Sequence, residues 1–202
     1  MYKTDQELFW AGDFGNKYID RNSSEELLYS KVMMWTRMLR SAKNVSSIRE
    51  FGCNIGLNLV ALKKLHPKLK LFGHEINEEA VLKANEFNVA KIKRESIIDK
   101  IEDEPVDLTF TSVVLIHINP KHLSNVYENL VNGTNRYVLV SEYYNPTPIE
   151  IDYRGHSEKM YKRDFAGELI DNYGLKLVDY GFLYKRDNWA PQGDVNWFLL
   201  EK

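Results

Sequence analysis

The most specific chemical feature of the sequence is a glycine-containing segment at residues 50–58, which reads Glu-Phe-Gly-Cys-Asn-Ile-Gly-Leu-Asn. Gly52 and Gly56 allow the backbone to approach a ligand closely. A dinucleotide site would need Gly-x-Gly-x-x-Gly, because a pyrophosphate binds at the following helix N-terminus, but Asn54 stands at the middle glycine. Glu50 would also repel a phosphate. We therefore expect a ligand with an amino group and a sulfonium in place of phosphates, although a plain strand-to-helix turn would use the same glycines.

A second carboxylate, Glu75, ends a short apolar run 19 positions after Gly56. At the end of the second strand of a parallel sheet, such a carboxylate accepts hydrogen bonds from both hydroxyls of a ribose. Ligands of open parallel sheets bind beyond the carboxyl ends of the strands. We therefore expect Glu75 and the glycine loop to lie close together at the carboxyl ends of the strands.

Two histidines are candidates for a general base. His117 follows an apolar run, and at the same sheet edge its neutral imidazole would take a proton from a hydroxyl or ammonium group. A histidine there would equally cap the next helix, and His156, in an irregular polar stretch, is the alternative base. Arg154 would clamp a carboxylate or phosphate by two parallel hydrogen bonds, or form a structural salt bridge. The candidate substrate-binding residues are Tyr143, Tyr144, Tyr153 and Arg154.

Four aromatic residues surround two glycines at residues 9–18, before the first clear helix. Aromatic faces attract a sulfonium cation more strongly than a neutral thioether. We therefore expect Trp10, Phe14 and Tyr18 to form a lid over a cofactor. The alternative is that this segment fills the core.

The elements that position these residues alternate between strands and helices. Helical spacing and caps predict helices at 57–65, 78–89, 121–130 and 162–172, and one that begins at Asn22-Ser23-Ser24. Strands are predicted at 45–51, 70–75, 106–114, 137–143, 176–184 and 195–200. Strands joined by helices form a parallel sheet through right-handed crossovers, and the last two are close enough for an antiparallel edge hairpin. One α/β domain is expected, with the lid and first helix at 1–44, the cofactor-binding core at 45–145, and the acceptor-side segment and hairpin at 146–202.

Charge and composition exclude several classes of protein. The 27 Lys+Arg and 29 Asp+Glu residues give a formal charge of −2, which offers no general attraction to nucleic acid. No apolar run approaches the roughly 20 residues that span a bilayer, so we expect a cytoplasmic protein without membrane contact. Cys53 is the only cysteine and can form no internal disulfide. The five histidines lack paired ligand spacing and predict no metal, and the basic clusters Lys63-Lys64 and 91–94 are expected at solvated helix ends.

Segment 50–58 resembles the first motif of the class I S-adenosylmethionine-dependent methyltransferases, acidic-x-Gly-x-Gly-x-Gly, with Asn54 at the middle glycine. The resemblance implies a Rossmann-like fold with a mostly parallel seven-stranded sheet, helices on both faces and S-adenosylmethionine as cofactor. It implies that 94–97 flanks the adenine, where Ser96 would hydrogen-bond the base and Ile97 would pack on it, unless this is a solvated loop. The other implied cofactor contacts are Cys53, Asn58, Ile76, Thr111, Ser112 and Val113.

Over nearly the entire chain, the sequence also resembles the pseudaminic acid biosynthesis-associated methylases, which accompany bacterial nonulosonic-acid surface-sugar pathways. The phrase Phe-Trp-x-Gly-x-Phe-Gly-x-x-Tyr-x-x-Arg-Asn at 9–22 carries this resemblance, with further matches at 50–58, 72–77, 107–120 and 142–156. It implies methyl transfer to O or N of a small sugar-type acceptor: a nucleotide-activated amino sugar, a nonulosonic acid or a related precursor. The alternatives are an inactive cofactor-binding scaffold and, less favoured without a Tyr-x-x-x-Lys pair, a nicotinamide oxidoreductase. The sequence leaves the oligomeric state open.

Overall fold

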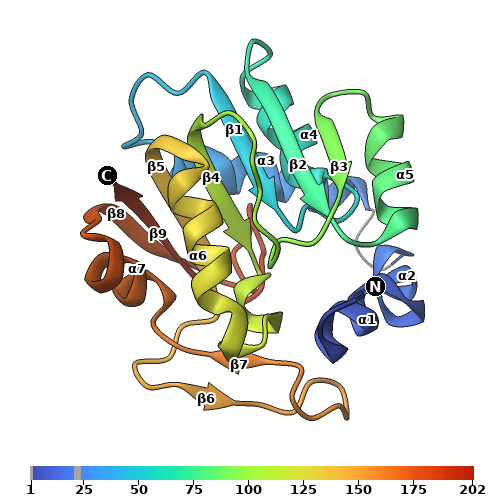
Figure 1. Ribbon diagram of the computed structural model, residues 1–202. Helices are drawn as coiled ribbons and strands as arrows, with labels where there is room; N and C mark the ends of the chain where they lie inside the picture. Colours follow the sequence, from blue (N-terminus) through green and yellow to red (C-terminus); the bar gives the residue numbers. More distant parts are fainter. Residues whose placement is uncertain (1, 21–23) are drawn as a thin grey trace.

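A mostly parallel sheet forms the centre of the protein. The computed structural model describes residues 2–20 and 24–202, and its main sheet has seven strands in the order β3-β2-β1-β4-β5-β9-β8 (Figure 1). Strands β1 to β5 pair parallel, whereas β9 and β8 pair antiparallel at one edge. This confirms the predicted fold class. The strands are β1 (Ser47–Phe51), β2 (Lys70–Glu75), β3 (Lys91–Arg94), β4 (Val106–Ser112), β5 (Thr134–Glu142), β8 (Lys176–Leu183) and β9 (Val195–Glu201).

Helices cover both faces of this sheet. On one face, Trp35 of α3 packs with Leu108 of β4, and on the other face Leu130 of α6 and Leu169 of α7 pack with Val138 of β5. The central strands are therefore buried on both faces, which accounts for their nearly continuous apolar runs. The helices are α3 (Glu25–Met38), α4 (Leu57–Leu65), α5 (Glu78–Glu86), α6 (Leu123–Asn132) and α7 (Phe165–Tyr173).

Two segments that are distant in sequence lie beyond the carboxyl ends of the parallel strands (Figure 1). One is the pair of N-terminal helices α1 (Asp5–Ala11) and α2 (Asp13–Asp20), and the other is the hairpin of β6 (Ile149–Glu150) and β7 (Tyr161–Lys162). The side-chain amide of Gln6 donates to the backbone oxygen of Glu158 at 2.8 Å and joins the two segments. The short 3-10 helices η1 (Leu115–His117) and η2 (Pro120–His122) follow β4. All of these elements lie beyond the carboxyl ends of the parallel strands, where a ligand is expected.

The aromatic N-terminal segment is helical. Thr4 and Glu7 form a capping box that begins α1, and Gly12 ends it. Ser24 caps α3 by accepting from the backbone N–H of Leu27 at 3.2 Å. Arg21, Asn22 and Ser23, which belong to the opening phrase and to the predicted helix start, lie outside the described residues.

The prediction that residues 91–94 lie at a solvated helix end is wrong, because they form the edge strand β3 beside β2. Its exposed lysines and arginine suit a sheet edge, where charge discourages pairing with another chain. Lys63 and Lys64 do lie in the last turn of α4. The helix predicted at 162–172 begins at Phe165, because Asp164 caps it. No helix among the described residues is long and apolar enough to cross a membrane.

Candidate functional site

A cavity of about 190 Å³ lies at the carboxyl edge of the sheet. It collects most of the predicted cofactor residues from the lid, the glycine loop and the ends of β2 and β4. Phe14, Gly56 and Thr111 do not line it: Phe14 stacks on Phe9 at 4.0 Å between ring centres, and Thr111 is fully buried in β4. The predicted residues that line the cavity are Trp10, Tyr18, Glu50, Gly52, Cys53, Asn54, Asn58, Glu75, Ile76, Ser96, Ile97, Ser112 and Val113, together with His117.

The backbone of the glycine loop explains its unusual middle residue. Gly52, Asn54 and Gly56 all have left-handed φ angles, of 75°, 49° and 76°. Asparagine adopts this region more readily than most residues, and Asn54 also accepts from the backbone N–H of Ile55 at 2.6 Å. A Cβ at position 52 would lie 2.7 Å from the side chain of Val114. The left-handed backbone and the packing against Val114 both favour glycine at 52, whereas asparagine satisfies position 54.

The carboxylate of Glu75 joins the glycine loop to the end of β2. Its Oε2 accepts from the backbone N–H of Asn54 at 2.7 Å, and its Oε1 accepts from the N–H groups of Ile76 and Asn77, each at 2.8 Å. Burial raises the pKa of Glu75, and these backbone donors oppose that rise. Oε2 retains accepting capacity for a further donor, such as a ribose hydroxyl.

A buried chain of polar side chains connects Glu50 to a residue that the sequence analysis missed. Asn58 donates to Oε1 of Glu50 at 2.6 Å, and Nζ of Lys31 donates to Oδ1 of Asn58 at 2.9 Å. Oε2 of Glu50 is buried and has no partner among the described residues. Burial raises the pKa of Glu50 to about 8 and lowers that of Lys31. Lys31 and Leu27, which lie one helical turn apart on α3, both line the cavity.

This arrangement fits an amino-acid moiety. The unpartnered Glu50 oxygen is placed to accept from an ammonium group, and the Lys31 ammonium is placed to pair with a carboxylate. Oε2 of Glu75, bonded to the backbone N–H of Asn54 in the glycine loop, offers an acceptor of the kind that suits a ribose hydroxyl. The donor and acceptor set therefore fits S-adenosylmethionine better than a dinucleotide.

The N-terminal helices close one side of the cavity. The rings of Trp10 and His117 have centres 4.6 Å apart, and those of Trp10 and Tyr18 are 5.3 Å apart. The backbone oxygen of Trp10 accepts from the side-chain amide of Asn77 at 3.1 Å. The Ser96 hydroxyl hydrogen-bonds Glu7 of α1. Trp10 and Tyr18 thus line the cavity, while the Ser96 hydroxyl is engaged with Glu7 of α1. Whether this segment acts as a lid stays a prediction.

His117 lies where the main cavity meets a second pocket. Its Nδ1 donates to the backbone oxygen of Lys159 at 2.6 Å, because a carbonyl can only accept, and this leaves a lone pair on Nε2. Burial lowers the pKa of His117 to about 4, so its imidazole is neutral at pH 7. The second pocket shares Tyr18, Val113 and His117 with the cavity and adds Tyr143, Tyr153, Arg154 and Met160.

Two predicted residues do not join this arrangement. His156 is exposed and lines neither pocket, and its ring packs edge-on against Phe9 at 5.1 Å between centres. Tyr144 is 41% exposed and faces Phe198, with ring centres 6.1 Å apart. Successive side chains at the end of β5 point in opposite directions, so Tyr143 enters the pocket and Tyr144 does not.

A buried carboxylate that the sequence analysis did not assign supports the segment carrying His117. Glu142 accepts from the backbone N–H groups of Val114, at 3.0 and 3.1 Å to its two oxygens, and of Leu115 at 3.1 Å. Burial raises the pKa of Glu142 to about 7. Val113 just before has a φ of 59°, a strained conformation for a β-branched residue that the surrounding structure must hold. A charged residue that ends a strand just after the apolar run 137–140 was the signal for Glu142.

One group of described residues has the spacing of metal ligands, namely His74, Glu95 and Asp103. Asp103 pairs with Lys93 and also with Arg49 at 3.4 Å, while His74 contacts Glu95 at 2.6 Å. These cations already balance the carboxylates, so we assign no metal to this group. Its members are far apart in the chain, so the sequence carries no local signal for this group.

The strand order, the glycine loop and the paired strand-end carboxylates together define the fold of the class I S-adenosylmethionine-dependent methyltransferases. A solved structure with this fold, magnesium protoporphyrin IX methyltransferase from Synechocystis PCC 6803 with bound SAH, is 12% identical, covers 98% of this chain and 100% of its own, and has a TM-score of 0.72. The N-methyltransferase NodS from Bradyrhizobium japonicum WM9 is 14% identical, with 89% and 98% covered and a TM-score of 0.66.

The plantazolicin methyltransferase BpumL in complex with SAH is 13% identical, covers 98% of this chain and 94% of its own, and has a TM-score of 0.67. Identities this low establish the fold alone. The sequence matches no protein-family model and no curated protein. The resemblance to the pseudaminic acid biosynthesis-associated methylases therefore stays a prediction.

Proposed function

We propose that the protein is an S-adenosylmethionine-dependent methyltransferase that acts on a small sugar-type acceptor at O or N. The observation that carries the cofactor assignment is the buried Oε2 of Glu50, which has no partner in the described part of the chain and lies in one cavity with Lys31 and Glu75. Structures with the same fold were solved with SAM or SAH bound, which supports this cofactor.

The cavity residues divide among the parts of this cofactor. Glu50 and Lys31 would hold its amino-acid end, Glu75 its ribose, and Ile97 with Ser96 its adenine. Gly52 and Asn54 allow the backbone to approach between them. When bound, S-adenosylmethionine supplies a methyl group activated by a positive sulfonium.

The residues of the chain contribute positioning, exclusion of water and proton transfer. Trp10 and Tyr18 cover the cavity next to His117 and present aromatic faces that stabilise a cation. A site closed to water favours a reaction in which charge is lost. Nε2 of His117 carries the lone pair that accepts the acceptor's proton, while alignment of the acceptor supplies the larger share of the rate.

The sugar-type acceptor rests on the resemblance of segments 9–22 and 142–156, and on the aromatic rings of Tyr143 and Tyr153 in the second pocket. The neighbours of this fold are named for magnesium protoporphyrin IX and plantazolicin, so the fold does not restrict the acceptor. An inactive scaffold that binds the same cofactor is the second candidate. We further propose a cytoplasmic location and no nucleic-acid partner, on the basis of charge and composition.

Calorimetry tests the cofactor assignment directly. SAM and SAH should bind more tightly than NAD, and tighter binding of NAD would overturn the proposal. Glu75→Ala should cost about 1.5–3 kcal/mol of SAH binding, because one charge-assisted hydrogen bond to the ribose is lost. Glu75→Gln keeps an acceptor oxygen for the backbone N–H groups of the glycine loop, so it shows whether a loss of affinity comes from the loop folding differently. The matched control is Glu78→Ala, because Glu78 is exposed and does not line the cavity.

Turnover separates the enzyme from the scaffold. A screen against nucleotide-linked amino sugars and nonulosonic acids, read by mass shift, should yield SAH and a methylated product. A protein that binds SAM and never forms SAH with any such acceptor is a binding module.

A further inference from the structure

The second pocket contains no carboxylate. Its seven lining residues include one cation, Arg154, three tyrosines, Tyr18, Tyr143 and Tyr153, and the neutral base candidate His117. The carboxylates closest to Tyr143 are engaged elsewhere: Glu142 accepts from backbone N–H groups and Asp194 pairs with Lys185 at 3.2 Å. The pocket therefore presents positive charge and aromatic surface to whatever enters it.

The backbone holds Arg154 in an uncommon conformation. Tyr153 and His156 exchange two backbone hydrogen bonds of 2.9 Å, and the two residues between them have φ angles of 52° for Arg154 and 84° for Gly155. This is the geometry of a tight two-residue hairpin, in which both central residues are left-handed. Arginine has no intrinsic preference for that region, and residues held in it cluster at ligand clamps.

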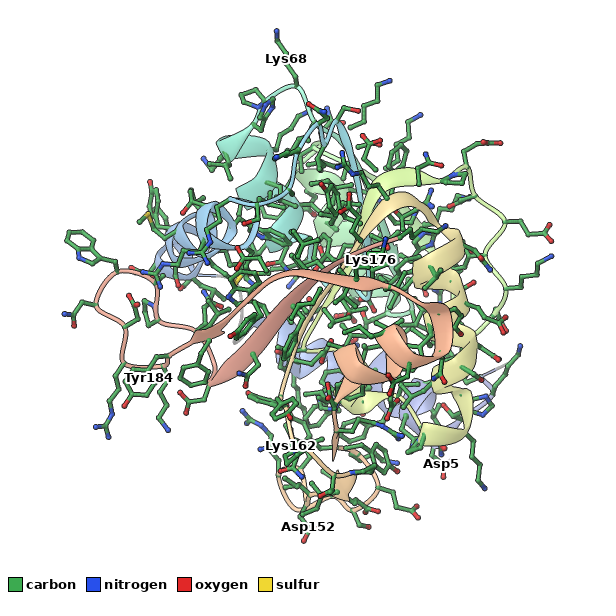
Figure 2. The ribbon with its side chains drawn as sticks, turned by 90° about the vertical axis from the view of Figure 1, so that its left-hand side faces the viewer. Asp5, Lys68, Asp152, Lys162, Lys176 and Tyr184 are labelled. Carbon is green, nitrogen blue, oxygen red and sulfur yellow. The ribbon has the colours of Figure 1, made fainter. Side chains whose placement is uncertain are left out.

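Arg154 has no anionic partner among the residues that the structure describes; its guanidinium lies 5.8 Å from the ring centre of Tyr153. A second cation lies over another tyrosine of this pocket, because Nζ of Lys162 is 5.1 Å from the ring centre of Tyr143, although Lys162 does not itself line the pocket. Both come from the segment between β5 and α7, and Figure 2 shows Lys162 with Asp152 of that segment at one end of the molecule. Arg154 is exposed, so an anionic ligand can reach its guanidinium.

The same charges disfavour an amine as the methyl acceptor. An amine enters the site as an ammonium, and the second pocket offers it a guanidinium and no carboxylate. The neutral imidazole of His117 has a free lone pair on Nε2, which suits a hydroxyl acceptor, because a hydroxyl gives up its proton only as the new bond to carbon forms.

We propose that the acceptor is an anion, bound through its carboxylate or phosphate by Arg154, and that the methyl group goes to one of its uncharged hydroxyls. This inference rests on the proposed function and narrows it. A bond forms between the hydroxyl oxygen and the methyl carbon, and the bond from that carbon to the cofactor sulfur breaks with its electron pair left on sulfur. The hydroxyl proton passes to Nε2 of His117.

Binding of four hexose derivatives that differ in their charged group to the SAH-loaded protein tests the proposal. D-Glucuronate, a carboxylate, and glucose 1-phosphate, a phosphate, should both bind. Comparing their affinities shows whether the site prefers a carboxylate or a phosphate. Glucose should bind more weakly, and glucosamine, below the pKa of its amine, most weakly. Arg154→Glu should weaken the binding of the anions by about tenfold or more, because a charge-assisted fork is lost and a repulsion is added.

The control is Lys68→Glu, which makes the same change in net charge on an exposed residue that Figure 2 places at the opposite end of the molecule from Asp152. It should leave all four affinities unchanged. The proposal is wrong if no anion binds, if glucosamine binds as tightly as glucuronate, or if Arg154→Glu and Lys68→Glu behave alike. An N-methyl product from labelled SAM, identified by the methyl carbon shift, would overturn it as well. Failure to bind SAH would instead remove the proposed function.

Discussion

Nδ1 of His117 lies 2.6 Å from the backbone oxygen of Lys159, so one hydrogen bond links η1 at the end of β4 to the hairpin segment between β5 and α7. The link fixes the tautomer of the imidazole and the position of its Nε2 together. It also couples the base candidate to the segment that carries Tyr153 and Arg154. The second pocket and His117 are therefore built as one unit.

Replacing His117 tests its role as base. His117→Ala should lower turnover by about 10²–10⁴, because general-base catalysis typically contributes that much, while SAH affinity stays nearly intact. Single-turnover kinetics and calorimetry measure the two quantities. His156→Ala is the matched comparison, since His156 is exposed and lines neither pocket. Full activity in His117→Ala with loss in His156→Ala would move the base to His156.

The pKa of Glu50 predicts a proton linked to cofactor binding. With a pKa of about 8 in the ligand-free protein, Glu50 is mostly protonated at pH 7, and an ammonium group at its free oxygen favours the ionised form. Binding should therefore release a proton, and affinity for SAH should increase as the pH rises toward 8. Calorimetry in buffers of different ionisation enthalpy should show about one more proton released by the wild type than by Glu50→Gln. Equal proton counts would contradict this assignment.

The same shift has a consequence for stability. The folded-state pKa of Glu50 lies above its ordinary value of 4.5, so the folded protein binds more protons than the unfolded chain between 4.5 and about 8. This carboxyl group therefore makes the ligand-free protein more stable as the pH falls through that window. The free energy of unfolding of Glu50→Gln should lack this contribution when the two proteins are compared at each pH.

The N-terminal helices are expected to respond to ligand. Trp10 touches His117 and its indole nitrogen is buried without a partner among the described residues, so a ligand in the cavity changes its surroundings. Hydrogen exchange over residues 9–18 should slow when SAH binds, and the fluorescence change should disappear in Trp10→Phe. Trp35, fully buried in the core, serves as the internal reference. Equal protection with and without SAH would make the segment part of the core.

The features that the sequence predicted well are local in origin. The turn at Gly52 and Asn54 depends on their own φ angles, and Glu75 lies at a strand end, so neighbouring residues were sufficient to predict where these three lie in the fold. The parallel order of the strands followed from their helical connections. The helical form of α1 was also visible in principle, because Thr4 and Glu7 form a capping box.

The features that the sequence did not predict depend on tertiary contacts. Lys31 belongs to the site only because α3 packs beside α4, which brings it to Asn58. Residues 91–94 form a strand only because β2 offers an edge. Tyr143 and Tyr144 were equivalent in the sequence, and the direction of each side chain at the end of β5 decides which one enters the pocket.

Glu142 should act as a positioning residue for His117. Its carboxylate accepts from the N–H groups of Val114 and Leu115 at the start of η1, and it does not line the cofactor cavity. Glu142→Ala leaves these buried donors unsatisfied and should cost about 1–3 kcal/mol of stability. Glu142→Gln keeps one acceptor oxygen and should fold, yet lower kcat by about 10–100-fold with SAH affinity unchanged, because a small displacement of His117 misaligns the base.

The pH profile and a neighbouring variant separate this role from a general loss of stability. In Glu142→Gln the imidazole resonances of His117 should shift and the acidic limb of the kcat profile should move, since the surroundings of the base have changed. Ser141→Ala, one residue earlier and equally buried, removes a hydroxyl with no side-chain hydrogen bond among the described residues and should alter neither quantity. If Glu142→Gln and Ser141→Ala have the same kcat and the same profile, Glu142 contributes to folding only, and His117 is held by its bond to Lys159 alone.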